Sequence, residues 1–352
     1  MTIDKGIFIK NVFYMLSYAF QELKHNNYEN IAGEKFEYIH DLFAEILIHG
    51  VSFQLKKGIH KGYVCNHDLL NTLRGKLDLH STITQKIRCD SKLVCEYDEF
   101  SSNNIFNQII KTTLTILIKQ PDVKIKRKRQ LSQLLLFFQD VDLIDFKKIK
   151  WNTFRFDRNT RTYQMLLYIC HFIIDEMILT TEKGPYNMVT YMDEQMNRLF
   201  EKFVLEYYKK EFPQITPEAK YIDWNVDKTL STNDFLPIMK TDIILHFETG
   251  RDLIIDTKYY GQSMQYHYNK PTIHSHNLYQ IHTYIINKDI GHKGEVDGML
   301  LYAKTEEDIV PNGQIQLIDG NIIYFRTLDL AQDFKHIKEQ LNNIVLLYLY
   351  NS

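Results

Sequence analysis

The order of predicted elements in the second half of the chain constrains its fold most. Two stretches carry apolar residues at helical spacing, and three others have the composition and alternation of strands. A turn containing Gly250 joins the first two strands, as in a β-hairpin. The order helix, hairpin, helix, strand predicts an α/β domain built around a mixed sheet. The helices are expected at 193–212 and 277–286, and the strands at 238–247, 253–260 and 298–302.

The first half of the chain has a different pattern. Several glycines interrupt short strand-like runs between residues 51 and 94, and helices surround them, which predicts an α+β part. A length of 352 residues, at roughly 150 residues per domain, predicts two domains. We place the α+β domain at 1–160 and the α/β domain at 161–352. The helices of this half and of the junction are expected at 11–23, 36–49, 104–119, 130–138 and 163–179.

Charge and cysteine content narrow the function classes. The chain has 42 basic and 44 acidic residues, so it lacks the strongly basic character typical of many nucleic-acid-binding proteins. Residues 1–160 hold 24 basic and 18 acidic side chains, a balance of +6 that permits DNA binding without requiring it. The four cysteines form no CxxC pair, and no leader-like or membrane-spanning apolar run is present. We therefore expect a cytoplasmic protein without a membrane partner.

The hairpin carries the best candidate for chemistry. Because strand side chains alternate between faces, pairing its strands can bring Asp242, Asp256 and Lys258 onto one surface. Two converging carboxylates suit Mg²⁺, which is typically held by one or two carboxylates together with water and substrate phosphate. A nearby lysine can orient the attacking water or offset charge that develops on the phosphate. The alternative is a solvated hairpin face with one ion pair, and the hairpin alone does not separate the two.

Flanking helices supply further candidates. Glu201 lies on the helix before the hairpin, where a third acid could reach the metal, although Glu194 and Glu206 fit equally well on composition. Gln280 and Tyr284 lie one helical turn apart on the helix after the hairpin and face the same way. They could hydrogen-bond a phosphate or Lys258. The alternative is an ordinary helix surface with a half-buried tyrosine.

This order of residues resembles the PD-(D/E)XK nuclease core, and the Gln-x-x-x-Tyr element resembles its RecB-like branch. More narrowly, the chain resembles the McrC family, the nuclease subunit of McrBC-type modification-dependent restriction systems. Two features depart mildly from the superfamily pattern: Thr241 precedes Asp242 where proline is usual, and the acid before Lys258 is aspartate. The resemblance is carried by 9–19, 73–78, 107–111, 241–260 and 277–280.

The resemblance implies a function and a partner. It implies Mg²⁺-dependent DNA cleavage in a 5-methylcytosine-type restriction system, with Asp242 and Asp256 as metal ligands and Lys258 as the catalytic lysine. The backbone carbonyl of Thr257 would be a further metal ligand. It also implies that residues 1–160 dock onto a hexameric McrB-like AAA+ GTPase and stimulate its GTP hydrolysis. This chain has no P-loop, so we expect it to bind no nucleotide itself.

Two other functions and several other clusters stay open. The chain could be a non-catalytic scaffold that activates the GTPase, or a stand-alone RecB-like repair nuclease. Zinc binding by the histidines at 267–282 is disfavoured by their spacing, although His274 or His276 could contact phosphate. The basic run 124–129 could touch DNA or an acidic partner, or could simply be a solvated helix end. The segment 74–76 could face the motor or could be a turn with exposed bases.

Overall fold

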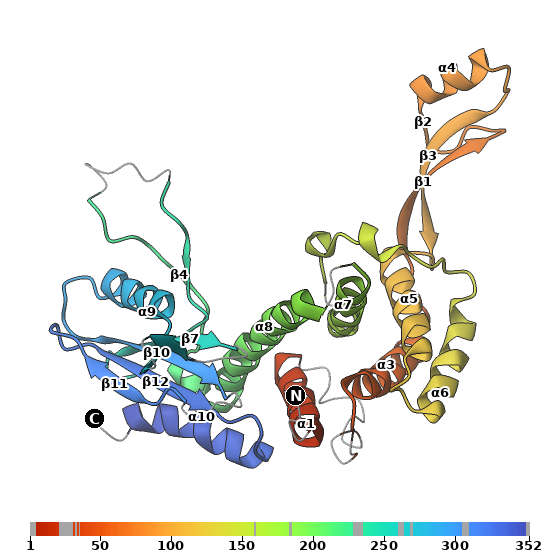
Figure 1. Cartoon of the computed structure of the whole chain (residues 1–352). Coiled ribbons are helices and arrows are strands. Elements are labelled where there is room, and N and C mark those ends of the chain that lie inside the picture. Colours follow the sequence, from red (N-terminus) through yellow and green to blue (C-terminus); the bar gives the residue numbers. More distant parts are fainter. Residues whose placement is uncertain are drawn as a thin grey trace. The chain divides into compact units, whose positions relative to one another are not determined.

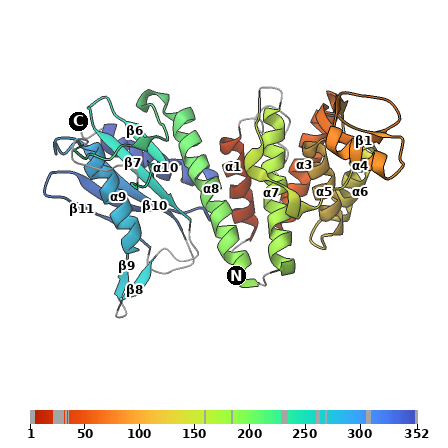
Figure 2. The same cartoon turned by 90° about the horizontal axis from the view of Figure 1, so that it is seen from above.

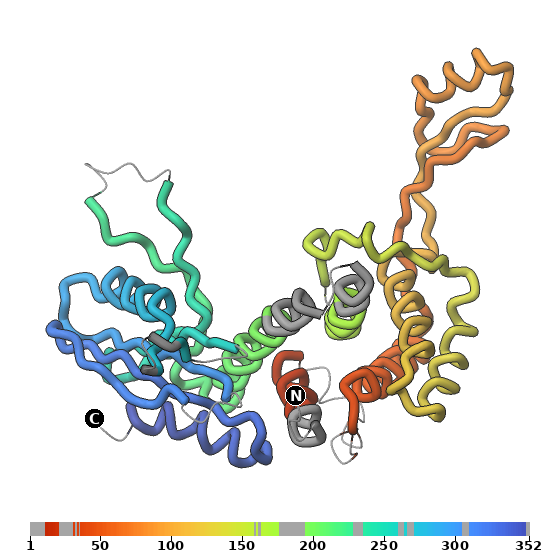
Figure 3. Tube along the Cα trace, viewed as in Figure 1, coloured from red at the N-terminus to blue at the C-terminus, as the bar shows by residue number. Residues whose placement is uncertain are grey.

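The computed structural model describes most of the chain, and Figure 3 follows its Cα trace. The described residues are 5–20, 31, 34, 36–157, 160–182, 185–227, 235–259, 264–267, 270–304 and 310–349. None of the described helices is long and apolar enough to cross a membrane.

The chain divides into two compact units. One is Tyr38–Ile178, and the other joins Met1–Glu37 to Leu179–Ser352. This division differs from the single boundary after residue 160 that the sequence predicts. The first helix packs with the C-terminal unit, because its buried face complements a helix far along the chain. The assignment of separate roles to 1–160 and 161–352 remains a prediction.

The Tyr38–Ile178 unit combines helices with a small sheet (Figure 1). Its helices are α3 (Ile39–Lys56), α4 (Leu79–Ile87), α5 (Ile105–Lys119), α6 (Ile125–Leu135) and most of α7 (Arg161–Glu182). Short 3₁₀ helices occur at Leu136–Phe138, Phe146–Lys148 and Trp151–Thr153. Its strands are β1 (Gly62–Leu70), β2 (Lys76–Leu77) and β3 (Leu93–Ser101), in the antiparallel order β1-β3-β2.

The β1–β3 pair forms a long ribbon that extends away from the helices of its own unit, with α4 at its far end (Figure 1). Gly75 has a positive φ of 67°, and a Cβ there would lie 2.4 Å from the carbonyl oxygen of Glu96. Glycine is therefore required at this close approach. Arg74 stacks on Tyr97 and lies 3.6 Å from a carboxylate oxygen of Glu99. Arg74, one of the two bases beside this turn, is thus held against the ribbon by Tyr97 and Glu99.

A buried ion pair ties α3 to α6. The guanidinium of Arg127, 3% exposed, lies 2.6 Å from Asp41 and 2.5 Å from Glu45. The sequence left two interpretations of the basic run 124–129, a surface that touches DNA or an acidic partner and a solvated helix end. Neither applies to Arg127, because its side chain is buried within the unit. Helical periodicity turns its side chain inward, toward the acids of α3.

The second unit is built on a five-stranded mixed sheet of order β11-β12-β10-β7-β6. Strands β7 and β12 each pair with β10 in parallel, whereas the edge strands β6 and β11 pair antiparallel. Its strands are β4 (Tyr221–Ile222), β5 (Met239–Lys240), β6 (Ile243–His246), β7 (Asp252–Lys258), β8 (Gln265–His267), β9 (Lys270–Thr272), β10 (Val296–Ala303), β11 (Gly313–Gln316) and β12 (Ile322–Leu328). The predicted mixed sheet flanked by helices is confirmed.

Helix α9 (Ser275–Lys288) covers one face of this sheet (Figure 2). The apolar cluster beneath it includes Ile244, Ile254, Ile281 and Leu300. At Gly298 of β10, a Cβ would lie 2.7 Å from side-chain atoms of Ile281 and Ile285, so glycine lets the helix approach closely. This close packing holds the Gln280 face of α9 above the end of β7.

The other helices of this unit are α1 (Lys5–Ala19), α8 (Pro185–Glu211) and α10 (Phe334–Leu349), with a 3₁₀ turn at Pro213–Ile215. Helix α10 lies on the opposite face of the sheet from α9 (Figure 1). The Tyr348 hydroxyl donates to the buried carboxylate of Asp297 at 3.0 Å. Helix α1 packs along α8, and the hydroxyl of Tyr18 donates to Glu211 at 2.8 Å.

Most predicted helices of the described chain are confirmed, with shifted ends. The helix expected at 130–138 begins earlier, as α6, and ends in a 3₁₀ turn. The predicted strand 238–247 is wrong in one respect, because it is broken into β5 and β6 at Thr241 and Asp242. Residue 260, the predicted end of the second strand, lies outside the described residues.

Candidate active site

The break between β5 and β6 places Asp242 at the edge of the sheet. Strand β5 pairs with β4, and Thr241 continues that contact by donating its amide to the carbonyl of Lys220. Strand β6 then pairs with β7, with Ile244 opposite Ile254. Extending this register by two residues places Asp242 opposite Asp256, as the alternation predicts. The Oδ2 atom of Asp242 accepts hydrogen bonds from the amide and hydroxyl of Thr257, at 2.8 and 2.9 Å.

Asp256 and Lys258 form an ion pair near the end of β7. The Lys258 ammonium lies 2.7 Å from Oδ2 of Asp256, whose side chain is only 2% exposed. Burial raises the pKa of Asp256 to about 7, and the charge of Lys258 opposes this rise, whereas the charge of Asp242 adds to it. Burial also raises the pKa of Asp242, against its two hydrogen bonds from Thr257. Asp242 and Asp256 are therefore buried acids with raised pKa values, and the hairpin does not present a solvated face here.

A chain of hydrogen bonds holds Lys258 from the side of α9. The ammonium of Lys258 donates to Oε1 of Gln280 at 3.1 Å, and Nε2 of Gln280 donates to the hydroxyl of Tyr284 at 2.9 Å. That hydroxyl in turn donates to the backbone carbonyl of Lys240 at 2.9 Å. The predicted contact between the Gln-x-x-x-Tyr element and Lys258 is thus present. Its role in catalysis stays a prediction.

Glu201 on α8 lies within electrostatic reach of the two aspartates. Burial raises its pKa to about 7, the charge of Asp242 adds to this rise, and the charges of Lys240, Arg198 and Lys258 oppose it. Of the glutamates that composition left open, Glu206 instead forms a surface pair with Lys209 at 2.9 Å. The structure therefore brings Glu201 near the site, but its role there is untested.

The donor set fits a hard divalent cation. Asp242 and Asp256 supply oxygen ligands, and their mutual repulsion would fall if a cation lay near them. Within the described residues, no group of three or more His, Cys, Asp or Glu side chains is arranged to hold a metal ion. The fit therefore rests on the two aspartates, with the Thr257 carbonyl as the further ligand that the family resemblance implies, and Glu201 remains outside that set.

The histidines near α9 lie beside this site. The rings of His274 and His276 are 5.5 Å apart, and His276 is one turn before Gln280. Burial lowers the pKa of His276, and the charges of His274 and Lys258 lower it further. His276 is thus close to Lys258, which keeps a contact with substrate phosphate open. The side chain of His267 lies outside the described residues.

Sequence reasoning missed Asn197, Lys240 and the side-chain role of Thr257, which all shape the site. The Thr257 side chain fixes Asp242, and Oδ1 of Asn197 accepts the amide of Tyr259 at 2.9 Å, just beyond Lys258. Lys240 contributes positive charge to both Glu201 and Asp242. Local spacing could have indicated two of them, because Asn197 lies one helical turn before Glu201 on α8 and Lys240 lies two residues before Asp242.

The sequence is similar to known proteins along most of its length. Residues 6–303 match the family described as McrBC 5-methylcytosine restriction system component. The chain is 26% identical over 347 residues to the type IV methyl-directed restriction enzyme EcoKMcrBC of Escherichia coli K12, covering 97% of this chain and 98% of that protein.

Two solved structures show weaker likeness. The refined half-complex from a tetradecameric assembly of Thermococcus gammatolerans McrB AAA+ hexamers with bound McrC is 16% identical, with a TM-score of 0.45 over 96% of this chain and 76% of that one. The cryo-EM structure of the Thermococcus gammatolerans McrBC complex is 17% identical, with a TM-score of 0.36 over 58% and 59% of the two chains. Because the family match spans most of the sequence, this chain belongs to the McrBC 5-methylcytosine restriction system component family.

Proposed function

We propose that this chain is the nuclease subunit of a modification-dependent restriction system and hydrolyses DNA phosphodiesters with Mg²⁺. The observation that carries the proposal is the cluster of Asp242, Asp256 and Lys258 at one sheet edge, held by Gln280, in a chain of this family. A scaffold role alone does not account for two buried aspartates whose pKa values are raised.

Each residue has a distinct task in this proposal. Asp242, Asp256 and the Thr257 carbonyl would hold the cation, which supplies Lewis-acid activation of phosphate and water when bound. The ammonium of Lys258 lies where it can stabilise charge that develops on a phosphate beside the aspartates. Gln280, which is itself held by Tyr284, would fix the direction of Lys258, and Glu201 would accept a proton near the site.

The partner is the second part of the proposal. Family membership supports an McrB-like AAA+ GTPase hexamer as the motor with which this chain acts on DNA containing 5-methylcytosine. We infer that the Tyr38–Ile178 unit, with its long β1–β3 ribbon, contributes to docking and to stimulation of GTP hydrolysis. The candidate site residues all belong to the other unit, so we expect the two activities to be separable by mutation.

The test is cleavage of methylated plasmid DNA in Mg²⁺, with GTP and a cognate McrB-type GTPase. The wild-type chain should cut the plasmid, and Lys258→Ala should slow cutting by at least about 10²–10³-fold, because a transition-state cation is lost. GTP turnover of the motor should stay within about twofold in this variant, because the site is far in sequence from the ribbon.

Controls separate the proposal from its rivals. Lys335→Ala removes an exposed lysine on α10, so it should cut at the wild-type rate. If wild type and Lys258→Ala both fail to cut but both stimulate GTP turnover, the chain is a scaffold. If the wild-type chain cuts unmodified DNA efficiently without motor or GTP, it is a stand-alone nuclease.

A further inference from the structure

Three cations act on Glu201, and they come from three different elements. The charges of Lys240 on β5, Arg198 on α8 and Lys258 on β7 all oppose the rise in the pKa of this glutamate. Of the three, Lys258 is paired with Asp256, 2.7 Å away. Within the described part of the chain, the exposed side chains of Lys240 and Arg198 have no hydrogen-bond or ion-pair partner. They are therefore available to bind an anion beside the candidate site.

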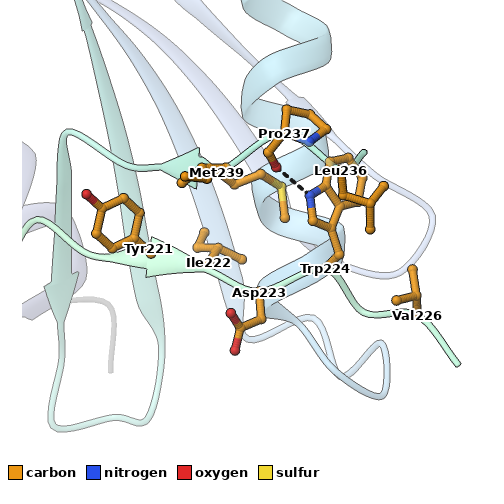
Figure 4. Close-up of a pocket in the computed structure, with 9 residues that line it drawn as sticks. Tyr221, Ile222, Asp223, Trp224, Val226, Leu236, Pro237 and Met239 are labelled. Atoms are coloured by element: carbon orange, nitrogen blue, oxygen red, sulfur yellow. Dashed lines mark hydrogen bonds between the residues drawn. The ribbon is translucent and has the colours of Figure 1, made fainter. Parts of the chain in front are cut away.

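The β4–β5 ribbon directs Lys240 toward solvent. On one face of the ribbon, Ile222 and Met239 are buried with the apolar cluster beneath α9. Figure 4 shows these two side chains together with Trp224 beside a pocket, and the ring of Tyr221 lies apart from Trp224. Lys240 lies opposite Tyr221 in the register, so these two exposed side chains share the other face. Lys240 is thus on the outer face of the ribbon and is not part of the pocket wall.

The backbone of Lys240 is fixed next to the site. Its carbonyl accepts the hydrogen bond from the Tyr284 hydroxyl, which is the last contact in the chain that begins at Lys258. Asp242 follows two residues later, and the charge of Lys240 opposes the rise in the pKa of that aspartate. Because its own side chain is exposed, Lys240 lies at the rim of the site and not in its interior.

Helix α8 brings the second exposed cation to the same acids. Arg198 lies one turn before Glu201, so the two side chains share a face of the helix. The residue before it, Asn197, accepts the amide of Tyr259 at 2.9 Å, which ties this turn of α8 to the end of β7. Arg198 and Lys240 therefore approach Glu201 from a helix and from a ribbon that are separate in the sequence.

A DNA substrate would need positive charge at this rim. The acids of the site, Asp242, Asp256 and Glu201, repel a phosphodiester, because like charges raise each other's energy in a poorly solvated site. Lysine and arginine side chains are the usual protein contacts to backbone phosphates. A cation that already has an acidic partner would have to give it up to bind a phosphate, and neither Lys240 nor Arg198 has one among the described residues.

We propose that Lys240 and Arg198 form a phosphate-binding pair, in which each side chain binds one backbone phosphate of the DNA next to the phosphate that is cut. This inference rests on the proposed nuclease function and deepens it, because it assigns substrate contacts to this chain and not to the motor alone. Phosphate contacts carry no base information, so the pair would fix the register of the DNA without choosing its sequence. The alternative is that both cations only balance the charge of Glu201.

The test measures binding of the full chain to a labelled DNA duplex in EDTA, where no strand is cut, over a range of salt concentrations. Lys240→Ala and Arg198→Ala should each lower the slope of log Kd against log salt by about 0.9, the value for one phosphate contact on a duplex. The double variant should lower it by about 1.8, because the two contacts are separate. Lys240→Arg and Arg198→Lys keep the charge and should keep the wild-type slope.

Paired cations near the same two elements give matched controls. Lys220, just before β4, pairs with Glu218 at 3.2 Å, and Lys209 on α8 pairs with Glu206 at 2.9 Å. Both lysines are exposed, so Lys220→Ala and Lys209→Ala remove the same charge as the test variants do. Because these lysines already have acidic partners, both control variants should keep the wild-type slope.

A Glu201→Gln background separates phosphate binding from charge balance. Glutamine removes the charge that the two cations would otherwise balance. A role limited to balancing Glu201 predicts that Lys240→Ala and Arg198→Ala have no effect on the slope in this background. The phosphate-binding pair predicts the same loss of slope as in the wild-type background.

Three results would overturn the phosphate-binding pair: equal slopes in wild type and both alanine variants, an equal loss in the two controls, or no binding of the wild-type chain at low salt. Cutting of methylated plasmid with the motor tests the nuclease function separately. Lower slopes in a chain that never cuts would support the pair and refute the nuclease function. Wild-type slopes with normal cutting in both alanine variants would refute the pair alone.

Discussion

Buried charge is arranged in opposite ways in the two units of this molecule. In the Tyr38–Ile178 unit, one buried guanidinium, Arg127, lies between the carboxylates of Asp41 and Glu45. Hydrogen bonds from His49 and Arg127 lower the pKa of Glu45, against the effect of burial. In the other unit, Asp242, Asp256 and Glu201 crowd around Lys258, and burial raises the pKa of all three acids.

This difference distinguishes a structural ion pair from a candidate catalytic site. At Arg127 one guanidinium donates a hydrogen bond to each of the two acids, so the charges there need no ligand. Around Lys258 burial raises the pKa values of the acids and their charges repel one another, and a divalent cation would offset that repulsion. Variants of Arg127 and of the residues around Lys258 should therefore behave differently.

The largest effect is expected from Arg127→Met. This variant leaves Asp41 and Glu45 without their cation, and removing one partner of a buried pair typically costs about 3–5 kcal/mol of stability. Urea unfolding of the full chain, followed through the Tyr38–Ile178 unit, should show this loss. Lys126→Met removes an exposed cation of the same helix and should change stability by less than about 0.5 kcal/mol. Equal stability of the two variants would contradict a structural role for Arg127.

A smaller effect, on activity rather than stability, is expected from Gln280→Leu. This variant removes the acceptor that holds Lys258, and loss of such a supporting contact typically costs about 10–100-fold in activity. Plasmid cutting in the presence of the motor should fall by that factor, and the unfolding midpoint should hardly change. Thr283→Ala, on an exposed side of α9, should cut within about twofold of wild type. A stability loss without a rate loss would make Gln280 a packing residue.

The smallest effect is expected from Glu201→Gln, without divalent cations. Because the folded pKa of Glu201 is raised to about 7, the acid favours the folded state when protonated and costs stability as pH rises from its unfolded value through 7. Glutamine lacks that cost. The variant should therefore gain about 1 kcal/mol at pH 8, after allowance for solvent screening, or about 2–4 °C in Tm.

The gain should vanish at pH 4, where the wild-type glutamate is also protonated. Glu206→Gln, one turn further along α8, removes only a surface pair and should show no such pH dependence. A gain that is equal at both pH values would mean that the effect does not come from ionisation of Glu201.

Local patterns predicted much of the fold and the core of the site. Strand alternation predicted that Asp242 and Asp256 meet, and the register of β6 and β7 agrees because side-chain period in a sheet is fixed at two. Helical spacing predicted that Gln280 and Tyr284 share a face, and they hydrogen-bond to each other. Patterns could not predict the strand break at Thr241, since it depends on a contact with distant Lys220.

Other parts depended on contacts between residues far apart in the chain. The basic run 124–129 gave no sign that Arg127 is buried, because its partners lie more than eighty residues earlier. The sequence pattern also did not predict that α1 packs on α8, and this contact changes which residues belong to the same unit. The effect of Lys240 on Glu201 was missed for the same reason, because Glu201 lies on a separate helix far earlier in the chain.

The sequence by itself indicated most of the helices, the strands of the hairpin, the family and the acids and lysine that are candidates for the site, because these depend on residue type and on spacing within single helices and strands. The tertiary structure decided which charges are satisfied and which are crowded. That distinction depends on burial and on the sum of neighbouring charges from separate elements, and electrostatic energy in a poorly solvated site changes steeply with distance. Arg127 and Lys258 are similar cations in the sequence, and only their surroundings make one a structural contact and the other a candidate catalyst.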